Sequence, residues 1–114
     1  MLLMSGAAAG GASASMVDVF VADFHSDAPA SCRPSDVPLD HAQARAFFAR
    51  AKRVDYRTLH DNYEIAPCHI EGTMRRNGKV CDWKIRPGAT GSIRCGSRSF
   101  YFACDSCADL FGAR

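Results

Sequence analysis

Residues 68–86 read CHIEGTMRRNGKVCDWKIR and hold the strongest structural signal in the chain. Asn77-Gly78 lies between two strand-like runs, and a type I′ hairpin turn needs positive φ at both central residues, which this dipeptide tolerates. The turn therefore aligns Arg76 with Lys79. The same register pairs Met74 with Cys81, Gly72 with Trp83 and Ile70 with Ile85.

The two strands of this hairpin should have one apolar and one polar face, because side chains alternate between the faces of a strand. The apolar face holds the last three of these pairs, Met74/Cys81, Gly72/Trp83 and Ile70/Ile85, and Gly72 leaves room there for the Trp83 ring. The other face should be in contact with water, and His69 is expected to be exposed there. The remaining residues of that face are Glu71, Thr73, Asp82, Lys84 and Arg86.

Two further strands are predicted after the hairpin. Pro87-Gly88 ends the second strand, since proline has no amide hydrogen to donate to a sheet. A strand at 92–95, a polar turn at 96–99 and a returning strand at 100–104 follow. The apolar face continues through Ile93, Cys95, Phe100, Phe102 and Cys104. The sequence thus predicts a four-stranded antiparallel meander over about residues 63–104.

An amphipathic helix is predicted over about residues 40–53. Asp40 is its N-cap, and Gln43 three residues later completes a capping-box pattern. Apolar residues recur at helical spacing and form a stripe that should pack on the apolar face of the sheet. The stripe contains Ala44, Phe47, Phe48, Ala51 and Val54. The expected fold class is α+β, stabilised by disulfides.

The segments around this helix carry weaker patterns. Residues 17–22 alternate weakly and suggest a short strand, and residues 25–38 read as a proline-containing loop tethered by Cys32. Residues 55–62 are expected to be a connector without regular structure.

The N-terminal residues 1–15, MLLMSGAAAGGASAS, resemble the apolar region and small-residue cleavage site of a secretory signal peptide, although the basic start is missing. The alternatives are a truncated signal peptide and a disordered tail. The stretch is too short and glycine-rich to span a bilayer, so no membrane span is expected in the mature chain. Residues 16–114 are expected to form a single α+β domain.

Six cysteines in 114 residues favour disulfides and an oxidising compartment, periplasmic or extracellular. Pairing Trp83 with Ile93 places Cys81 opposite Cys95, close enough for a bond across neighbouring strands. The four remaining cysteines are expected to pair as Cys104–Cys107 and Cys32–Cys68, with Cys32–Cys107 as a competing pair.

The Cys104-x2-Cys107 spacing also supports a competing interpretation as a small zinc-binding or thiol-redox protein. The alternative zinc ligands are Cys81, Cys95, Cys104 and Cys107, with Cys68 and His69 as further candidates. A second C-x2-C knuckle is absent from the sequence. Only seven residues follow Cys107, too few for the strands that a thioredoxin-like fold requires. We therefore expect no cofactor, with zinc as the alternative.

Two groups of histidines and carboxylates are candidates for acid–base or metal chemistry. One is Asp23, His25 and Asp27 at alternating positions, and the other is His60-Asp61 with Glu64 nearby. Neither comes with a nucleophile or a glycine-rich loop, so no catalytic residue is identified and an enzyme is not expected. The net charge of +2 is spread along the chain, which argues against nucleic acid as a partner.

These observations favour binding over catalysis. The leading hypothesis is an exported, disulfide-rich protein of the inhibitor or immunity type, whose partner is another protein such as a toxin or hydrolase. A structural protein of the cell envelope is the third hypothesis.

Overall fold

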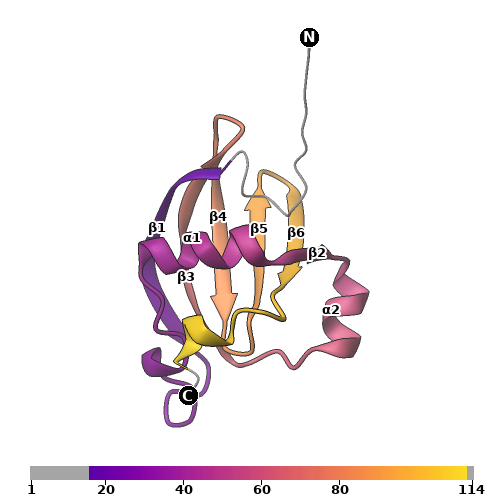
Figure 1. Cartoon of the computed structure of the whole chain (residues 1–114). Helices are drawn as coiled ribbons and strands as arrows, with labels where there is room; N and C mark the ends of the chain where they lie inside the picture. The colour runs from indigo at the N-terminus through magenta and orange to yellow at the C-terminus, as the bar shows by residue number, and fades with distance from the viewer. Residues whose placement is uncertain (1–15, 113–114) are drawn as a thin grey trace.

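The structure, a computed structural model, describes residues 16–112, and the predicted signal peptide or tail at 1–15 lies outside the described residues. The described chain confirms the α+β class and has an antiparallel sheet with the strand order β1-β3-β4-β5-β6-β2 (Figure 1). The strands are β1 (Met16–Ser26), β2 (Lys52–Val54), β3 (Cys68–Arg76), β4 (Lys79–Arg86), β5 (Thr90–Cys95) and β6 (Arg98–Ala103). The helices are η2 (Pro34–Asp36), α1 (His41–Arg50), α2 (Tyr56–Asn62) and η3 (Ala108–Phe111).

The meander β3-β4-β5-β6 forms the centre of the sheet. Gly72 pairs with Trp83 and Trp83 with Ile93, as the turn at Asn77-Gly78 predicts. Both turn residues have positive φ, 52° at Asn77 and 81° at Gly78. A Cβ atom on Gly72 would lie 2.8 Å from Trp83 Cζ2 and 1.7 Å from the Phe20 carbonyl oxygen, so this position requires glycine.

The predicted four-stranded meander is only part of the sheet, because β1 and β2 bring the number of strands in the described residues to six. A four-stranded meander would leave backbone groups of β3 and β6 unpaired along both edges. β1 pairs with β3 and β2 pairs with β6, so β1 and β2 are the edge strands of the sheet. β1 is longer than the expected strand at 17–22, and two register shifts, at Val17/Phe20 and Val21/Asp23, interrupt its alternation. These irregularities explain why its sequence pattern is weak.

The helix at 40–53 is shorter than predicted. Its start is correct, because the Asp40 carboxylate accepts a hydrogen bond from the Gln43 amide at 2.8 Å and Asp40 N–H donates to Gln43 Oε1 at 3.0 Å. The helix ends at Arg50, however, and Val54 pairs with Tyr101 in the sheet. The pairing gives partners to backbone groups at the edge of β6, which another helical turn would leave unpaired.

The expectation of an irregular connector at 55–62 is also wrong. Residues Tyr56–Asn62 form the short helix α2, and the Asp55 side chain caps it by accepting a hydrogen bond from the Thr58 amide at 2.7 Å. This helix has only one buried residue, Leu59. Its sequence therefore lacks the apolar stripe by which longer helices are predicted.

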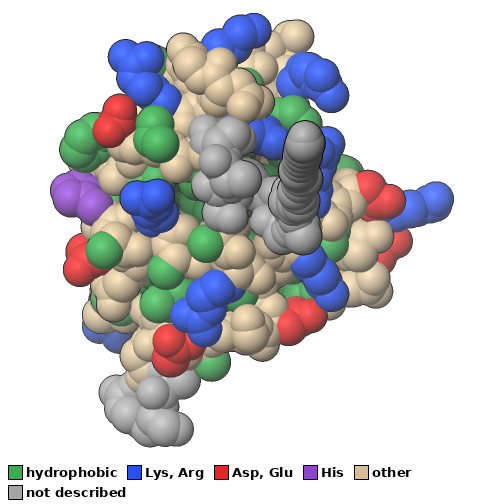
Figure 2. All heavy atoms as spheres, turned by 45° about the horizontal axis from the view of Figure 1, so that its top comes forward, with side chains coloured by type: hydrophobic (Ala, Val, Ile, Leu, Met, Phe, Trp, Pro, Cys, Tyr) green, Lys and Arg blue, Asp and Glu red, His purple; other side chains and the backbone are tan. Residues whose placement is uncertain are grey.

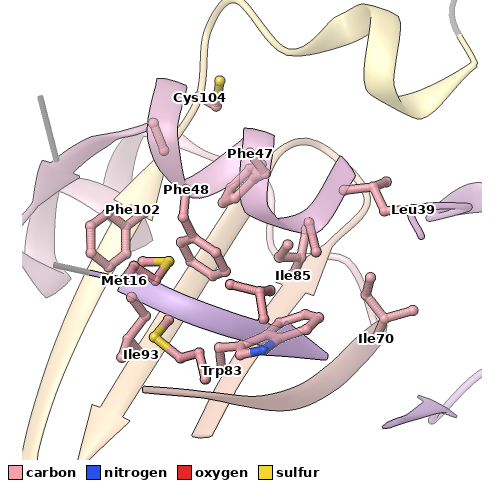
Figure 3. Packing of buried hydrophobic residues seen from close by; sticks show 14 of the residues in the cluster. Met16, Leu39, Phe47, Phe48, Ile70, Trp83, Ile85, Ile93, Phe102 and Cys104 are labelled. Carbon is pink, nitrogen blue, oxygen red and sulfur yellow. The ribbon is translucent and has the colours of Figure 1, made fainter. Parts of the chain in front are cut away.

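The core lies between α1 and one side of the sheet, which we call the covered face (Figure 3). Phe48 packs edge-on against Trp83 and Phe102, with ring centroids 5.8 and 5.5 Å apart. The Trp83 indole N–H donates to the Thr73 carbonyl at 3.0 Å, so its one polar group is satisfied. Phe47 and the Phe111 ring of η3 extend this packing toward the C-terminus.

Disulfide bonds, predicted from the cysteine count, are present at all six cysteines. Cys81 is joined to Cys95 across β4 and β5, with Cα atoms 4.6 Å apart, which is the pair that the hairpin register predicts. The other bonds are Cys32–Cys68 and Cys104–Cys107, and the competing pair Cys32–Cys107 does not form. Cys32–Cys68 ties the long loop after β1 to the start of β3.

Candidate functional site

The sheet side opposite α1, which we call the open face, carries a groove beside α2. The volume of this groove is ≈ 270 Å³. We call it the α2 groove, and its lining combines aromatic, aliphatic and basic side chains. The main lining side chains are Tyr56, Leu59, His60, Ile65, Lys84, Arg86 and Tyr101.

α2 supplies the aromatic wall of the groove. The Tyr56 ring lies 5.4 Å from the ring of Tyr101 on β6 and 5.9 Å from the His60 ring one helical turn later. Leu59 is buried below them and fixes the helix to the sheet. Tyr56 nevertheless stays 59 % exposed and Ile65 42 % exposed. Large exposed apolar side chains next to a concave surface are typical of binding sites.

β4 supplies the basic side of the groove. Arg86 Nη1 donates to the Ala66 carbonyl at 2.8 Å, which holds the segment before β3 against the sheet. Lys84 is exposed, and within residues 16–112 its ammonium group forms no salt bridge. The groove therefore offers an apolar, aromatic surface with two cations, Lys84 and Arg86, neither of which forms a salt bridge within residues 16–112. Such a surface suits a ligand group that is apolar and carries a carboxylate.

The hollow surface continues from the α2 groove across the open face. A neighbouring depression of ≈ 550 Å³ shares Lys84, Ser92 and Tyr101 with the groove and reaches Ala22 of β1. Its walls are more polar and include both signs of charge, with Glu71, Asp82 and Arg94. The two depressions together make one extended concave surface centred on Tyr101.

The segment after α2 is fixed to the C-terminal part of the chain by Asp105. Its carboxylate accepts hydrogen bonds from Lys52 Nζ and the Tyr63 hydroxyl, both at 3.1 Å. The bond from Lys52, followed by that from Tyr63, lowers the pKa of Asp105 below its ordinary value. The Asp105 hydrogen bond likewise raises the pKa of Lys52. This link joins β2 and the residue after α2 to the segment that follows β6.

The first histidine group that the sequence suggested is only partly assembled. His25 Nε2 lies 3.0 Å from Asp27 Oδ1, while Asp23 Oδ1 instead accepts from the Phe24 amide. His69 pairs with Glu71 at 2.7 Å, and the His25 and His69 rings lie 5.5 Å apart. The expectation that His69 is exposed is wrong, since it is 5 % exposed. The unpredicted extension of β1 to Ser26 places His25 opposite it.

The second histidine group lies at the α2 groove. His60 Nδ1 is 3.3 Å from Asp61 Oδ1, and Glu64, which is exposed, takes no part in this pair. Within residues 16–112 there is no group of three or more histidine, cysteine or carboxylate side chains arranged to hold a metal ion.

The four alternative zinc ligands are all engaged in disulfides. Cys81 is bonded to Cys95 and Cys104 to Cys107, and a disulfide sulfur is not the thiolate that binds zinc. Cys104 is 4 % exposed and Cys107 fully buried, whereas redox-active cysteines are accessible to their substrates. The structure therefore lends no support to the zinc or thiol-redox hypothesis in this oxidised form.

The sequence singled out His60 as a candidate for acid–base or metal chemistry, but it did not predict the groove. Lys84 and Arg86 were placed correctly on the polar face, but Tyr56 and His60 were assigned to a connector. The signal that could have found them is the Asp55-x-x-Thr58 spacing, which is typical of a capped helix start.

The chain matches no protein-family model, no curated protein and no solved structure at a significant level of similarity. No described helix is long and apolar enough to cross a membrane.

Proposed function

We propose that this is a small exported binding protein of the inhibitor or immunity type, which holds a protein partner on its open face. The partner is a toxin or hydrolase that inserts an apolar side chain, flanked by a carboxylate, into the α2 groove. The observation that carries the proposal is the groove itself, where Tyr56, Tyr101 and Lys84 meet on an uncovered sheet face.

The composition of the groove supports a protein partner. Tyrosine and arginine are over-represented among the residues that dominate protein–protein binding energies, especially where a concave surface excludes water. Tyr56 and Tyr101 already pack against each other, so little side-chain freedom is lost when a partner binds. Lys84 favours an acidic partner group next to the apolar one, because its charge is not compensated within residues 16–112.

The size of the surface also fits a protein. A groove of ≈ 270 Å³ accommodates one large side chain, whereas a stable interface covers about 800 Å² on each partner. The adjoining depression of ≈ 550 Å³ and the exposed helix α2 supply further contact area.

The three disulfides support export and a rigid binding surface. They close chain segments of 36, 14 and 3 residues and engage every cysteine. Disulfides of this kind persist in oxidising compartments, and small exported domains use them to make up for a limited core.

The experiment uses disulfide-intact protein as bait in a periplasmic extract, followed by an activity assay of the captured protein. We expect capture of a toxin or hydrolase and inhibition of its activity. Lys84→Glu should weaken binding by about tenfold or more, because it places a negative charge opposite the partner's carboxylate.

The matched control is Arg45→Glu, which makes the same change of charge from an exposed position on α1. It should bind the partner as the unmodified protein does. Equal weakening by both substitutions, or a captured protein whose activity is unchanged, would refute the proposal.

A further inference from the structure

A second site lies at the end of the sheet that carries the β3–β4 and β5–β6 turns. Four basic side chains from four strands line a hollow of ≈ 430 Å³ there: Arg53, Arg76, Lys79 and Arg98. We call them the basic cluster. Figure 2 looks toward this end of the molecule, and Lys and Arg side chains gather in the upper half of the view.

Three of these side chains surround one aromatic ring. The guanidinium carbons of Arg53, Arg76 and Arg98 lie 4.3, 4.5 and 5.4 Å from the centre of the Phe100 ring. Cation–π contacts of this kind hold a guanidinium against a ring while its N–H groups remain free at the edge. The ring thus positions three sets of donors around the same hollow.

The basic cluster has no salt-bridge partner among residues 16–112. Within residues 16–112 the salt bridges involve other cations, such as Arg50 with Asp109, Lys52 with Asp105 and Arg75 with Asp18, and none involves a member of the cluster. Burial, followed by repulsion from Arg53 and Arg98, lowers the pKa of Arg76 below its ordinary value.

One member of the cluster also has an unsatisfied donor. Arg76 Nε is buried and has no hydrogen-bond partner in the described part of the chain. Buried polar groups in folded proteins almost always have a partner, so an unpaired donor indicates an acceptor outside the described residues, such as water or a bound ligand. Covering the end of the core with arginine stems would explain the contact with Phe100, but not three guanidinium groups gathered without a counter-charge.

We propose that the basic cluster is a binding site for a phosphate group that carries more than one negative charge. Guanidinium groups bind phosphate oxygens through two parallel hydrogen bonds, and three of them meet around this hollow. A doubly charged tetrahedral anion matches the several uncompensated positive charges better than a single carboxylate does. The proposal does not depend on the α2 groove, which is lined by other residues.

The test is a titration of the folded, disulfide-intact protein with inorganic pyrophosphate in low salt, followed by calorimetry and by the NMR signal of the Arg76 Nε–H group. We expect saturable binding with a shift of that signal. Arg53→Gln and Arg98→Gln should each weaken binding by about tenfold, because each removes a charge-assisted pair of hydrogen bonds. Both side chains are exposed, so the variants should remain folded.

Arg45→Gln is the matched control, since it removes the same charge from an exposed position on α1 outside the cluster. It should leave the affinity unchanged. A second arm measures sedimentation with vesicles that contain phosphatidic acid, whose phosphomonoester headgroup supplies a phosphate with more than one negative charge from a surface. Binding by the unmodified protein that Arg98→Gln weakens by about tenfold, in either arm, supports the proposal and identifies the source of the phosphate. Absence of binding in both arms, or an equal effect of Arg45→Gln, would overturn it.

Discussion

The two faces of the sheet differ in what their side chains do. On the covered face, Phe48, Trp83 and Phe102 interlock beneath α1 and are buried. On the open face, Tyr56, Lys84 and Tyr101 border a hollow surface and retain contact with solvent. The comparison indicates that the covered face determines stability, whereas the open face is available for binding. Substitutions on the two faces should therefore have separable effects.

The largest expected effect is the loss of a core ring from the covered face. Phe48→Ala removes the ring that packs against Trp83 and Phe102 and leaves a cavity beneath α1. We expect the free energy of unfolding to fall by about 3–5 kcal/mol. Chemical denaturation with the disulfides intact measures this change. A loss below about 1 kcal/mol would show that the covered face is not the main source of stability.

The next effect distinguishes two of the three disulfides by the length of chain that each one closes. In the loop-entropy estimate, removing Cys32–Cys68 with serine at both positions costs about 4 kcal/mol for a separation of 36 residues, and removing Cys104–Cys107 costs about 1.5 kcal/mol for a separation of 3. Thermal unfolding of the two double variants gives the order. The reverse order would mean that the packing of the buried Cys104 and Cys107, rather than loop closure, determines their contribution.

A smaller effect is expected on the stability of the folded protein at acidic pH. The hydrogen bond from Arg50 lowers the pKa of Asp109, which joins α1 to η3, and the bonds from Lys52 and Tyr63 lower that of Asp105. A carboxylate with a lowered pKa in the folded state stabilises the protein above its unfolded pKa of about 3.9, and this stability is lost as the pH falls through the folded pKa.

Melting temperatures at neutral pH and near pH 3 check this prediction. Asp109→Asn and Asp105→Asn should melt below the unmodified protein at neutral pH, and the difference should shrink in acid. Because the two pairs are exposed, both differences should be small. A difference that stays constant between the two pH values would contradict the assignment of these pairs.

The sequence predicted the covered face well and the open face poorly, for physical reasons. Asn77-Gly78 determines the hairpin register locally, and the same register brings Cys81 opposite Cys95. The strands β1 and β2 and the helix α2 depend on tertiary contacts instead. β2 has only three residues and forms because the edge of β6 is free, and α2 buries only Leu59. Short elements with few buried residues leave little periodicity in a sequence.

The candidate sites also include features that the sequence predicts and features that depend on tertiary contacts. The Cys81–Cys95 pair could be inferred because the strands that carry both residues were predicted, whereas Cys68 and Cys107 both stayed open as partners for Cys32. The α2 groove could not be inferred, since it requires Tyr56 on α2 to lie against Tyr101 on β6, which are 45 residues apart. The basic cluster likewise combines residues of β2, β3, β4 and β6, and β2 was predicted as helix.

The central claim is that the open face binds a partner without being needed for stability, and one variant tests both halves of it. Tyr101→Ala removes the ring at the centre of the concave surface. We expect its free energy of unfolding to change by about 1 kcal/mol or less, because the ring is only half-buried. Its affinity for the captured toxin or hydrolase should fall by about 2 kcal/mol, or roughly thirtyfold. Unchanged affinity in a fully folded Tyr101→Ala protein would contradict the account.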